Sequence, residues 1–268
     1  MYRSLYGLSH NPFDKQLLKE KDFFESTDHR VMSNRLNYLK ETRGIGVFTA
    51  SPGMGKSYCL RCFEHSLNQN QYLMKYICLS TVSVADFYKE FCDQLGLDSK
   101  GGKTVMFKNI QDRLYYLFKE KKQPLILAID EAQYLSNGIL QDLKMLMNFR
   151  FDSLNCFTLI LSGEPVLNHT LERPIHEALR QRISVHYNFQ GLSADETTEY
   201  IKHKIRIAGG AESIISEDAL NTVANFCKGN PRIVDNVMST ALKAGAQMEK
   251  TTIDAEVILT AVNEQALG

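Results

Sequence analysis

A glycine-containing turn is the first place in the chain where residue types predict chemistry. The segment VFTASPGMGKSYCL, residues 47–60, matches the phosphate-loop pattern except that Ala50 stands in place of its first glycine. Gly53 and Gly55 can adopt positive φ and bring backbone N–H groups against phosphate oxygens without a side chain in the way. The pattern therefore survives the alanine, and the alternative is a chance glycine-rich turn between a strand and a helix.

The next two residues supply charge and a metal ligand. Lys56 can place a positive charge beside the β- and γ-phosphates of a nucleotide, and Ser57 can offer its hydroxyl to Mg²⁺. Both stand at the start of an expected helix, whose N-terminus favours an anion. We expect a nucleotide to be held by Ser51, Pro52, Gly53, Met54, Gly55, Lys56, Ser57 and Tyr58.

A second pair of residues would turn binding into hydrolysis. In LILAIDEAQYL, Asp130 and Glu131 follow an apolar run that is typical of a buried strand, at the edge where ligands bind in open α/β sheets. Asp130 could hold Mg²⁺ through water, while Glu131 could orient and polarise the attacking water. The alternative is an acidic turn that caps a strand.

Three arginines complete the set of chemical candidates. Arg180 and Arg182 in EALRQRISV precede an expected strand, and Arg232 in GNPRIV lies in the first turn of an expected helix. An arginine from a lid or a neighbouring subunit can neutralise charge on a transferring phosphoryl group. The alternative for each is a solvated surface arginine.

The elements that must position these residues alternate between strand and helix. Nearly continuous apolar character in three of the five expected strands indicates burial on both faces, and the alternation predicts a parallel, doubly wound α/β sheet. The expected strands are 44–50, 72–79, 124–130, 157–163 and 183–189. The expected helices between them are 55–69, 84–97, 108–121 and 137–152.

After residue 189 the pattern becomes entirely helical. Ser193 and Glu196 have the spacing of a capping box, and Pro231 occupies a first-turn position. Helices are expected at 193–209, 216–229, 231–247 and 254–266. The sequence therefore predicts an α/β nucleotide-binding domain over residues 1–190 and a small helical lid over 191–268.

Composition excludes several classes of protein. Lysine plus arginine equals aspartate plus glutamate, at 31 each, so bulk charge does not indicate a polyanion partner. No export signal and no run of about 18 apolar residues is present, which favours a cytoplasmic protein. The cysteines indicate free buried thiols, because the C-x-x-C at Cys59 and Cys62 has no second pair at zinc spacing.

These motifs together resemble the AAA+ ATPase family. ASPGMGKS is similar to Walker A, LILAIDE to Walker B, LRQR to the arginine-finger segment and GNPR to sensor 2. The resemblance implies a five-stranded sheet with a helical lid, bound ATP and Mg²⁺, and a ring or filament in which a neighbour's arginine completes hydrolysis. It implies Arg182 as the finger with Arg180 as the reserve, Arg232 as sensor 2, and Ser162 as sensor 1 with Glu164 as the alternative.

A narrower likeness appears at both ends of the expected sheet. LYGLSHNPFD and LSGEPVL resemble the ExeA-type ATPases and the TniB, TnsC and MuB transposition regulators. In such proteins the N-terminal segment, here residues 1–43, packs beside the adenine, which implies a role for Leu8, Pro12 and Phe13. An ordinary place in the core is the alternative for these three residues.

The two branches of this group predict different functions. The secretion ATPases carry a membrane span and a wall-binding part, which this sequence lacks, so we expect a stand-alone regulator that oligomerises on double-stranded DNA and activates a transposase. Candidate DNA contacts are Lys100, Lys103 and Lys108 in an expected loop, with Lys144 and Arg150 beyond it. Scattered solvated side chains are the alternative. An ATPase that serves secretion or envelope assembly through protein partners, and a switch that hydrolyses rarely, remain alternative functions.

Overall fold

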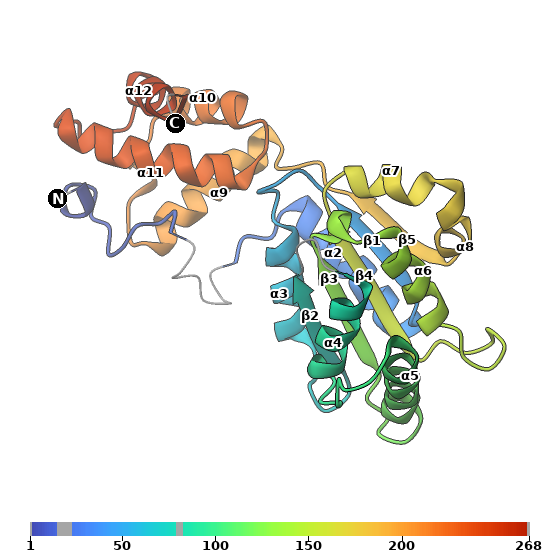
Figure 1. Ribbon diagram of the computed structural model, residues 1–268. Helices are drawn as coiled ribbons and strands as arrows, with labels where there is room; N and C mark the ends of the chain where they lie inside the picture. The colour runs from blue at the N-terminus through green and yellow to red at the C-terminus, as the bar shows by residue number, and fades with distance from the viewer. Residues whose placement is uncertain (1, 15–22, 79–82, 267–268) are drawn as a thin grey trace. The chain divides into compact units, whose positions relative to one another are not determined.

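The computed structural model describes residues 2–14, 23–78 and 83–266 (Figure 1). The chain divides into two compact units, each with its own core. The α/β unit comprises residues 31–52 and 56–189, and the helical unit comprises residues 1–30, 53–55 and 190–268. Residues 1–30, which the sequence analysis grouped with the α/β domain, thus cluster with the helices that follow residue 190.

The α/β unit is built on a five-stranded sheet in the order β2-β3-β4-β1-β5. All neighbouring strands are parallel, so their carboxyl ends meet at one edge of the sheet. The strands are β1 (Ile45–Thr49), β2 (Leu73–Cys78), β3 (Leu125–Asp130), β4 (Phe157–Gly163) and β5 (Ile183–Asn188). The predicted doubly wound parallel sheet is confirmed.

Burial follows the position of each strand in this order. β1, β3 and β4 are buried along their whole length, whereas the edge strands β2 and β5 expose several residues. The three central strands are the ones with continuous apolar runs, as expected for strands covered by helices on both faces. This burial fixes the position of the carboxyl edge, where the predicted site residues stand.

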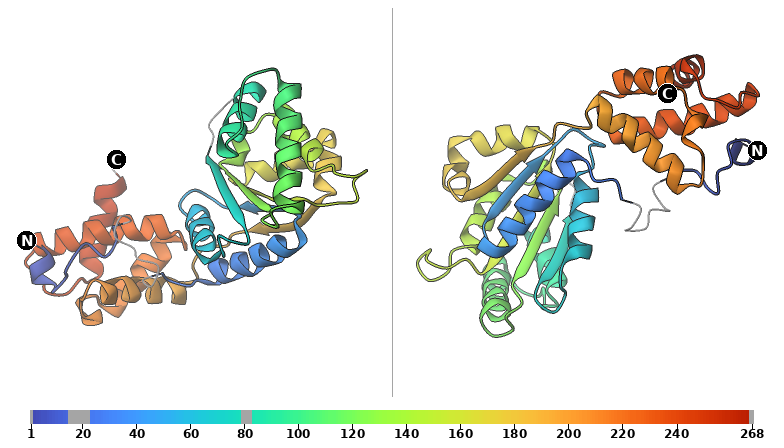
Figure 2. Two further views of the ribbon diagram at one scale, coloured as in Figure 1. Left: turned by 90° about the horizontal axis from the view of Figure 1, so that it is seen from below. Right: turned by 180° about the vertical axis from the view of Figure 1, so that it is seen from behind.

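Helices cover both faces of the sheet, as the views in Figures 1 and 2 agree. One face is covered by α2 (Thr27–Thr42) and α3 (Lys56–Ser66). The other face is covered by α4 (Val84–Gln94), α5 (Lys103–Lys119), α6 (Asn137–Leu146), α7 (Val166–Glu172) and α8 (Glu177–Arg180). Two short 3-10 turns, η3 (Ala132–Tyr134) and η4 (Pro174–His176), complete the unit.

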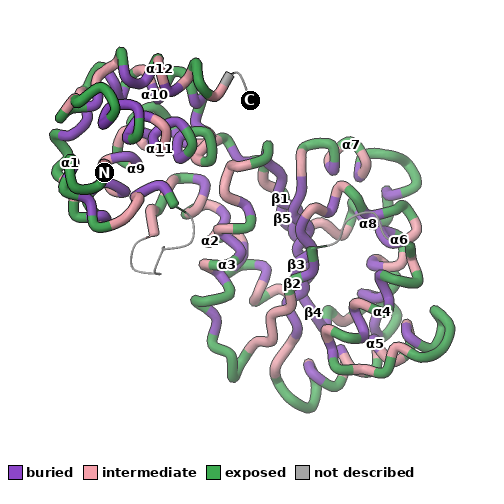
Figure 3. The backbone as a smooth tube through the Cα atoms, turned by 60° about the vertical axis from the view of Figure 1, so that its left-hand side comes forward, coloured by how far each residue is buried: buried purple, intermediate pink, exposed green. Residues whose placement is uncertain are grey.

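The core of this unit lies mainly between the sheet and α4 to α8. Phe87, Phe91 and Ile110 from the helices pack there with Leu127 and Leu159 from the strands. Alternate strand residues point to the opposite face, toward α2 and α3. The buried segments form a continuous layer along the sheet in Figure 3.

The helical unit contains α9 (Ala194–Ile207), α10 (Glu217–Cys227), α11 (Pro231–Gln247) and α12 (Ala255–Ala266), with the short α1 (Tyr2–Leu5) and η5 (Glu212–Ile214). The predicted capping box is confirmed, because Ser193 Oγ accepts from the Glu196 backbone and the Glu196 carboxylate accepts from the Ser193 backbone. Pro231 lies in the first turn of α11, as predicted. Tyr6, Leu8 and Phe13 are buried in the apolar cluster of these helices.

Two local predictions were wrong. The loop expected at residues 98–108 ends at Gly102, since α5 begins at Lys103 and buries Met106 and Ile110 on one face. The helix expected over residues 137–152 ends at Leu146, and the chain then turns through left-handed φ values of 47°, 57° and 66° at Arg150, Phe151 and Asp152.

Among the described residues, no helix has both the length and the apolar character needed to cross a bilayer.

Candidate functional site

The predicted phosphate loop connects β1 to α3 at the carboxyl edge of the sheet. Gly53 has a φ of 87° and Gly55 a φ of 96°, values that strain any residue with a Cβ. A Cβ at Gly55 would meet no atom within 4 Å, so its backbone borders open space. A Cβ at Gly53 would lie 2.6 Å from Asn230 Oδ1 and 2.7 Å from Arg232 Cβ, which belong to the same compact unit as Gly53. Both glycines are therefore required, one by conformation alone and one also by space.

The side chain of Lys56 is buried and fixed by a hydrogen bond to the segment that begins the phosphate loop. Its exposed fraction is 6%, and Nζ donates to the Ala50 carbonyl at 2.9 Å. The ammonium group therefore lies beside the carbonyl that follows β1, and the N-terminus of α3, which begins at Lys56, adds to the positive potential of the loop. Ser51 and Pro52 are exposed, whereas Met54 and Tyr58 are half-buried.

Asp130 is the most heavily hydrogen-bonded residue of the site. It is 1% exposed at the end of β3. Oδ2 accepts from Ser57 Oγ at 2.6 Å and from Tyr76 Oη at 2.7 Å, while Oδ1 accepts from Ser162 Oγ at 2.7 Å and from the Glu131 N–H at 3.1 Å. Burial by itself would raise the pKa of Asp130, but these hydrogen bonds outweigh it and hold the pKa below its ordinary value. Asp130 is thus a fixed carboxylate.

The chemistry of these donors fits Mg²⁺. The hydroxyl of Ser57 and the carboxylate of Asp130 are adjacent oxygen ligands of the kind that this hard cation prefers, and both lie at the phosphate loop. Elsewhere in the described part of the chain, no group of three or more His, Cys, Asp or Glu residues is arranged to hold a metal. All six cysteines are free thiols, as predicted, but the expected burial holds for only four of them, because Cys62 is half-buried and Cys78 is exposed.

Glu131 follows directly and has an unusual backbone. Its φ of 53° is left-handed, which turns the chain sharply out of β3 into η3. The carboxylate is half-buried, and Oε2 accepts from Gln133 Nε2 at 2.7 Å. The amide oxygen of Gln133 accepts in turn from the Glu164 N–H at 3.0 Å. Glu131 is thus connected to the end of β4 through one side chain.

The two candidates for sensor 1 differ in what they reach. Ser162 is fully buried and donates directly to Asp130. Glu164 reaches Glu131 only through its backbone and the Gln133 amide. The structure therefore brings Ser162 to the acidic pair by a side-chain contact.

Tyr76 and Gln133 were missed by sequence reasoning. Tyr76 pairs with Ala128 in the β2–β3 register, two residues before Asp130, and its pKa is raised by burial and by the hydrogen bond to that carboxylate. Its polar role depends on strand order, which a single sequence does not reveal. Gln133 stands two residues after Glu131, and that proximity is the only signal that could have found it.

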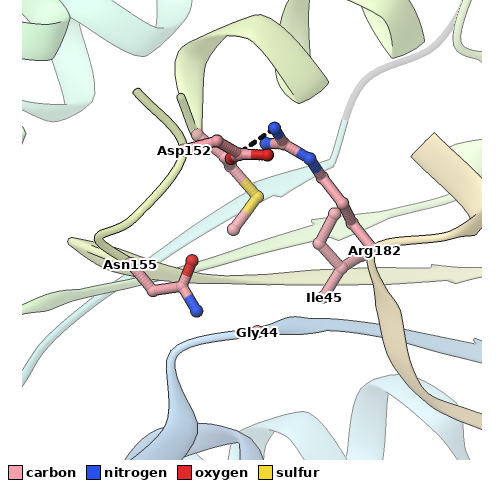
Figure 4. Close-up of a pocket in the computed structure, with 6 residues that line it drawn as sticks. Gly44, Ile45, Asp152, Asn155 and Arg182 are labelled. Atoms are coloured by element: carbon pink, nitrogen blue, oxygen red, sulfur yellow. Dashed lines mark ion pairs between the residues drawn. The ribbon is translucent and has the colours of Figure 1, made fainter. Parts of the chain in front are cut away.

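The candidate finger residues lie at the edge of the sheet where the strands begin, opposite the carboxyl edge. Arg182 precedes β5, and its guanidinium pairs with Asp152 and donates to the Lys144 carbonyl at 3.2 Å (Figure 4). Arg182 and Asp152 border a hollow beside Gly44, just before β1 begins. Arg180 donates to the Glu172 carbonyl at 2.8 Å. Because parallel strands start and end at opposite edges, neither arginine lies beside the acidic pair of its own chain.

The remaining candidates for nucleotide contact lie in the helical unit. Arg232 is the second residue of α11, and its backbone N–H donates to the Gly53 carbonyl at 3.4 Å within that unit. Phe13 is 3% exposed among apolar side chains of α9 to α12, and Pro12 beside it is also buried. The ordinary core position considered for Phe13 is what the structure shows.

The candidate DNA-binding residues are spread over α5, α6 and the segments beside them. Lys103 pairs with Asp142 at 2.6 Å, and Arg150 donates to Tyr115 Oη at 2.9 Å. Lys100 and Lys108 are exposed, while Lys144 is half-buried. Part of the positive charge in this group is thus engaged within the chain.

Comparison with known proteins finds a matching family model and a curated relative. Residues 39–171 match the model of an AAA domain. The chain is 30% identical over 247 residues to the general secretion pathway protein A of Aeromonas hydrophila, a match that covers 91% of this chain and 45% of that protein. The chain thus spans less than half the length of the relative it matches.

Solved structures agree on the fold at low sequence identity. The ORC2 protein of Aeropyrum pernix in ADPNP-ADP complexes has a TM-score of 0.69 at 14% identity, over 96% of this chain and 71% of that one. The Drosophila ORC bound to DNA has a TM-score of 0.72 at 14% identity, over 99% of this chain and 66% of that one. The chain therefore has the P-loop AAA+ fold, and residues 39–171 are the part of it that matches the AAA domain model.

Proposed function

We propose that the chain binds ATP with Mg²⁺ at the phosphate loop and hydrolyses it with Glu131 as the general base. The observation that carries this proposal is the cluster at the carboxyl edge of the sheet. Lys56 and Ser57 at the start of α3 and Asp130 and Glu131 at the end of β3 come from two separate segments and meet beside one loop of left-handed glycines.

Each residue has a distinct role in this proposal. The loop backbone and Lys56 bind and orient the phosphates, and Glu131 aligns the attacking water and accepts its proton. Ser57 and Asp130 would hold Mg²⁺, which when bound supplies charge neutralisation for the phosphates. The depressed pKa of Asp130 keeps its carboxylate charged for that task. Ser162, through Asp130, acts as sensor 1.

We further propose that hydrolysis is completed between copies of the chain. Arg182, with Arg180 in reserve, would act on a neighbour's nucleotide, while Arg232 would act on the nucleotide of its own chain. The position of Arg182 at the amino edge of the sheet supports action outside its own site. Asp152 must then release Arg182 when a neighbour is present.

The assembly proposed for these copies is a ring or filament on double-stranded DNA that selects targets and activates a transposase. Exposed Lys100 and Lys108 support a nonspecific phosphate contact, and a structural neighbour is an ORC bound to DNA. A second candidate is an ATPase that acts in secretion through protein partners, favoured by the 30% identity to a general secretion pathway protein.

The nucleotide proposal is tested by equilibrium binding and phosphate release with ATP and GTP. The wild-type chain should bind and hydrolyse ATP in a Mg²⁺-dependent way, whereas Lys56→Ala should lose binding because the charge over the loop is removed. Lys119→Ala, an exposed lysine at the end of α5, is the matched control and should behave as wild type. Equal ATP affinity in wild type and Lys56→Ala would overturn the proposed site.

The choice between the two partners is tested by a mobility-shift assay with double-stranded DNA, ATP or ADP, and two salt concentrations. The DNA proposal predicts a shift that needs ATP and that is reduced in Lys100→Ala/Lys108→Ala. The shift should also weaken at higher salt, because each counterion released from the DNA then gains less free energy. Lys119→Ala is again the control. No shift from an ATP-hydrolysing protein would favour the secretion candidate.

A further inference from the structure

The side-chain amide of Gln133 is engaged at both ends. Nε2 donates to Glu131 Oε2 at 2.7 Å, and Oε1 accepts from the Glu164 N–H at 3.0 Å. Only one orientation of the amide satisfies both contacts, since a carboxylate can only accept and a backbone N–H can only donate. The two partners therefore define how this amide must lie.

The end of β4 is shaped to leave room for this amide. A Cβ at Gly163 would lie 2.6 Å from Gln133 Oε1 and 3.3 Å from Gln133 N. Gly163 is buried, and its neighbour Ser162 donates to Asp130. Two residues at the end of β4 thus reach the acidic pair: Ser162 donates directly to Asp130, and Glu164 is connected to Glu131 through Gln133.

The amide also makes the two oxygens of Glu131 unequal. Gln133 occupies one lone pair of Oε2, so Oε1 is the less engaged oxygen and the better acceptor for a water molecule. The left-handed backbone of Glu131 and the hydrogen bond from its N–H to Asp130 fix the position of its Cα and Cβ. The hydrogen bond from Gln133 fixes its carboxylate. A base held at both ends keeps the near-attack geometry that hydrolysis needs.

We propose that Gln133 is a positioning residue that orients the Glu131 carboxylate for water activation and couples it to the turn after β4. This inference rests on the proposed hydrolysis of ATP by Glu131. Through Gln133, a movement of the Gly163–Glu164 turn is transmitted to the base. Gln133 itself contacts neither nucleotide nor metal in this scheme.

The discriminating variant is Gln133→Glu. A glutamate has the same size and can still accept from the Glu164 N–H, but it places a second carboxylate where Glu131 received a hydrogen bond. We expect kcat for ATP to fall by about tenfold or more, because the base loses its orientation. The KM for ATP should stay within about threefold of wild type, since the phosphate loop is unchanged.

A matched control exists on α4. Gln94 Nε2 donates to Glu90 Oε1 at 2.9 Å, so Gln94→Glu creates a comparable pair of carboxylates far from the phosphate loop in the sequence. This variant should keep the wild-type kcat and KM. Gln133→Met, which neither donates nor accepts a hydrogen bond, and Gly163→Ala, which crowds the amide, should both lower kcat without raising KM. These two variants decide the question if Gln133→Glu does not fold.

The outcomes separate this inference from the function on which it rests. Loss of turnover in Glu131→Gln, together with a wild-type kcat in folded Gln133→Glu or Gln133→Met, would overturn the role of Gln133 and leave the hydrolytic site intact. A fall in kcat together with a comparable rise in KM would show a structural role only. A lowered midpoint of thermal unfolding with unchanged kcat would show the same. Wild-type turnover in Glu131→Gln would instead remove the proposed function.

Discussion

At the scale of single residues, the site is organised by one buried carboxylate. Asp130 receives hydrogen bonds from α3, β2, β4 and its own chain neighbour, and these contacts hold its pKa down against the effect of burial. The sequence could predict Lys56, Ser57, Asp130 and Glu131, because the spacing of each is local to one motif. It could not predict Tyr76, whose hydroxyl reaches Asp130 only through the pairing of β2 with β3.

Removing the Tyr76 hydroxyl tests this arrangement. Tyr76→Phe should lower the free energy of unfolding at pH 7 by about 1 kcal/mol, a value reduced from that of a buried charged hydrogen bond because Tyr76 is 39% exposed. Urea unfolding measures the loss. The control is Tyr116→Phe, at a tyrosine with the same 39% exposure, which should change the free energy of unfolding little.

The same variant has a defined pH dependence. A carboxylate with a depressed pKa contributes stability that is present above its unfolded-state pKa, about 3.9, and is lost as pH falls through the lower folded-state pKa. The difference between wild type and Tyr76→Phe should therefore be constant from pH 5 to 7 and narrow below about pH 4. A difference that grows on acidification would contradict the assignment of a charged Asp130.

At the scale of elements, strands and capped helices were predictable and the segments between them were not. β4 spans the predicted residues, and the capping box at Ser193 identified the start of α9. The start of α5 and the end of α6 were misplaced, because Gly101–Gly102 suggested a longer loop and the apolar spacing of α6 continues past Leu146. The left-handed residues 150–152 carry no glycine that would have signalled the turn.

This turn makes a testable contact with the candidate finger. Asp152 pairs with Arg182, and its side chain is about half exposed. If Arg182 acts on a neighbour, Asp152→Asn should raise ATP turnover of the assembled protein, because the arginine no longer has to break its ion pair first. The expected increase is about twofold to fivefold, since a surface ion pair contributes up to about 1 kcal/mol. Glu212→Gln, which removes the pair with Arg206 in the helical unit, is the control for loss of an arginine ion pair. A fall in turnover would mean that Asp152 holds Arg182 in its working position.

At the scale of the whole molecule, the strand order brings the predicted site residues together. The N-terminal segment, by contrast, belongs to a different unit from the one expected. The order β2-β3-β4-β1-β5 places the ends of β1, β3 and β4 side by side, which is why motifs far apart in sequence converge. Residues 1–30 cluster with the helical unit, because Tyr6, Leu8 and Phe13 bury their side chains in its core. The sequence alone does not show which of two cores the apolar residues of an irregular N-terminal segment will join.

Action between copies predicts complementation. Lys56→Ala has an intact Arg182 but no nucleotide site, whereas Arg182→Ala has the nucleotide site but no finger. Each variant alone should be inactive, and an equimolar mixture should recover phosphate release if the arginine acts in trans. Gel filtration with ATP should show that both variants still assemble in the mixture. A mixture that stays inactive although mixed oligomers form would contradict the role of Arg182.

The central claim is that this site is assembled to hydrolyse ATP with Glu131 as its base, and Glu131→Gln tests it most directly. The substitution keeps the size of the side chain and removes its ability to accept a proton. Phosphate release measured beside ATP affinity should show wild-type binding with turnover reduced by about 100-fold or more. Turnover equal to that of wild type, with ATP bound, would contradict the account.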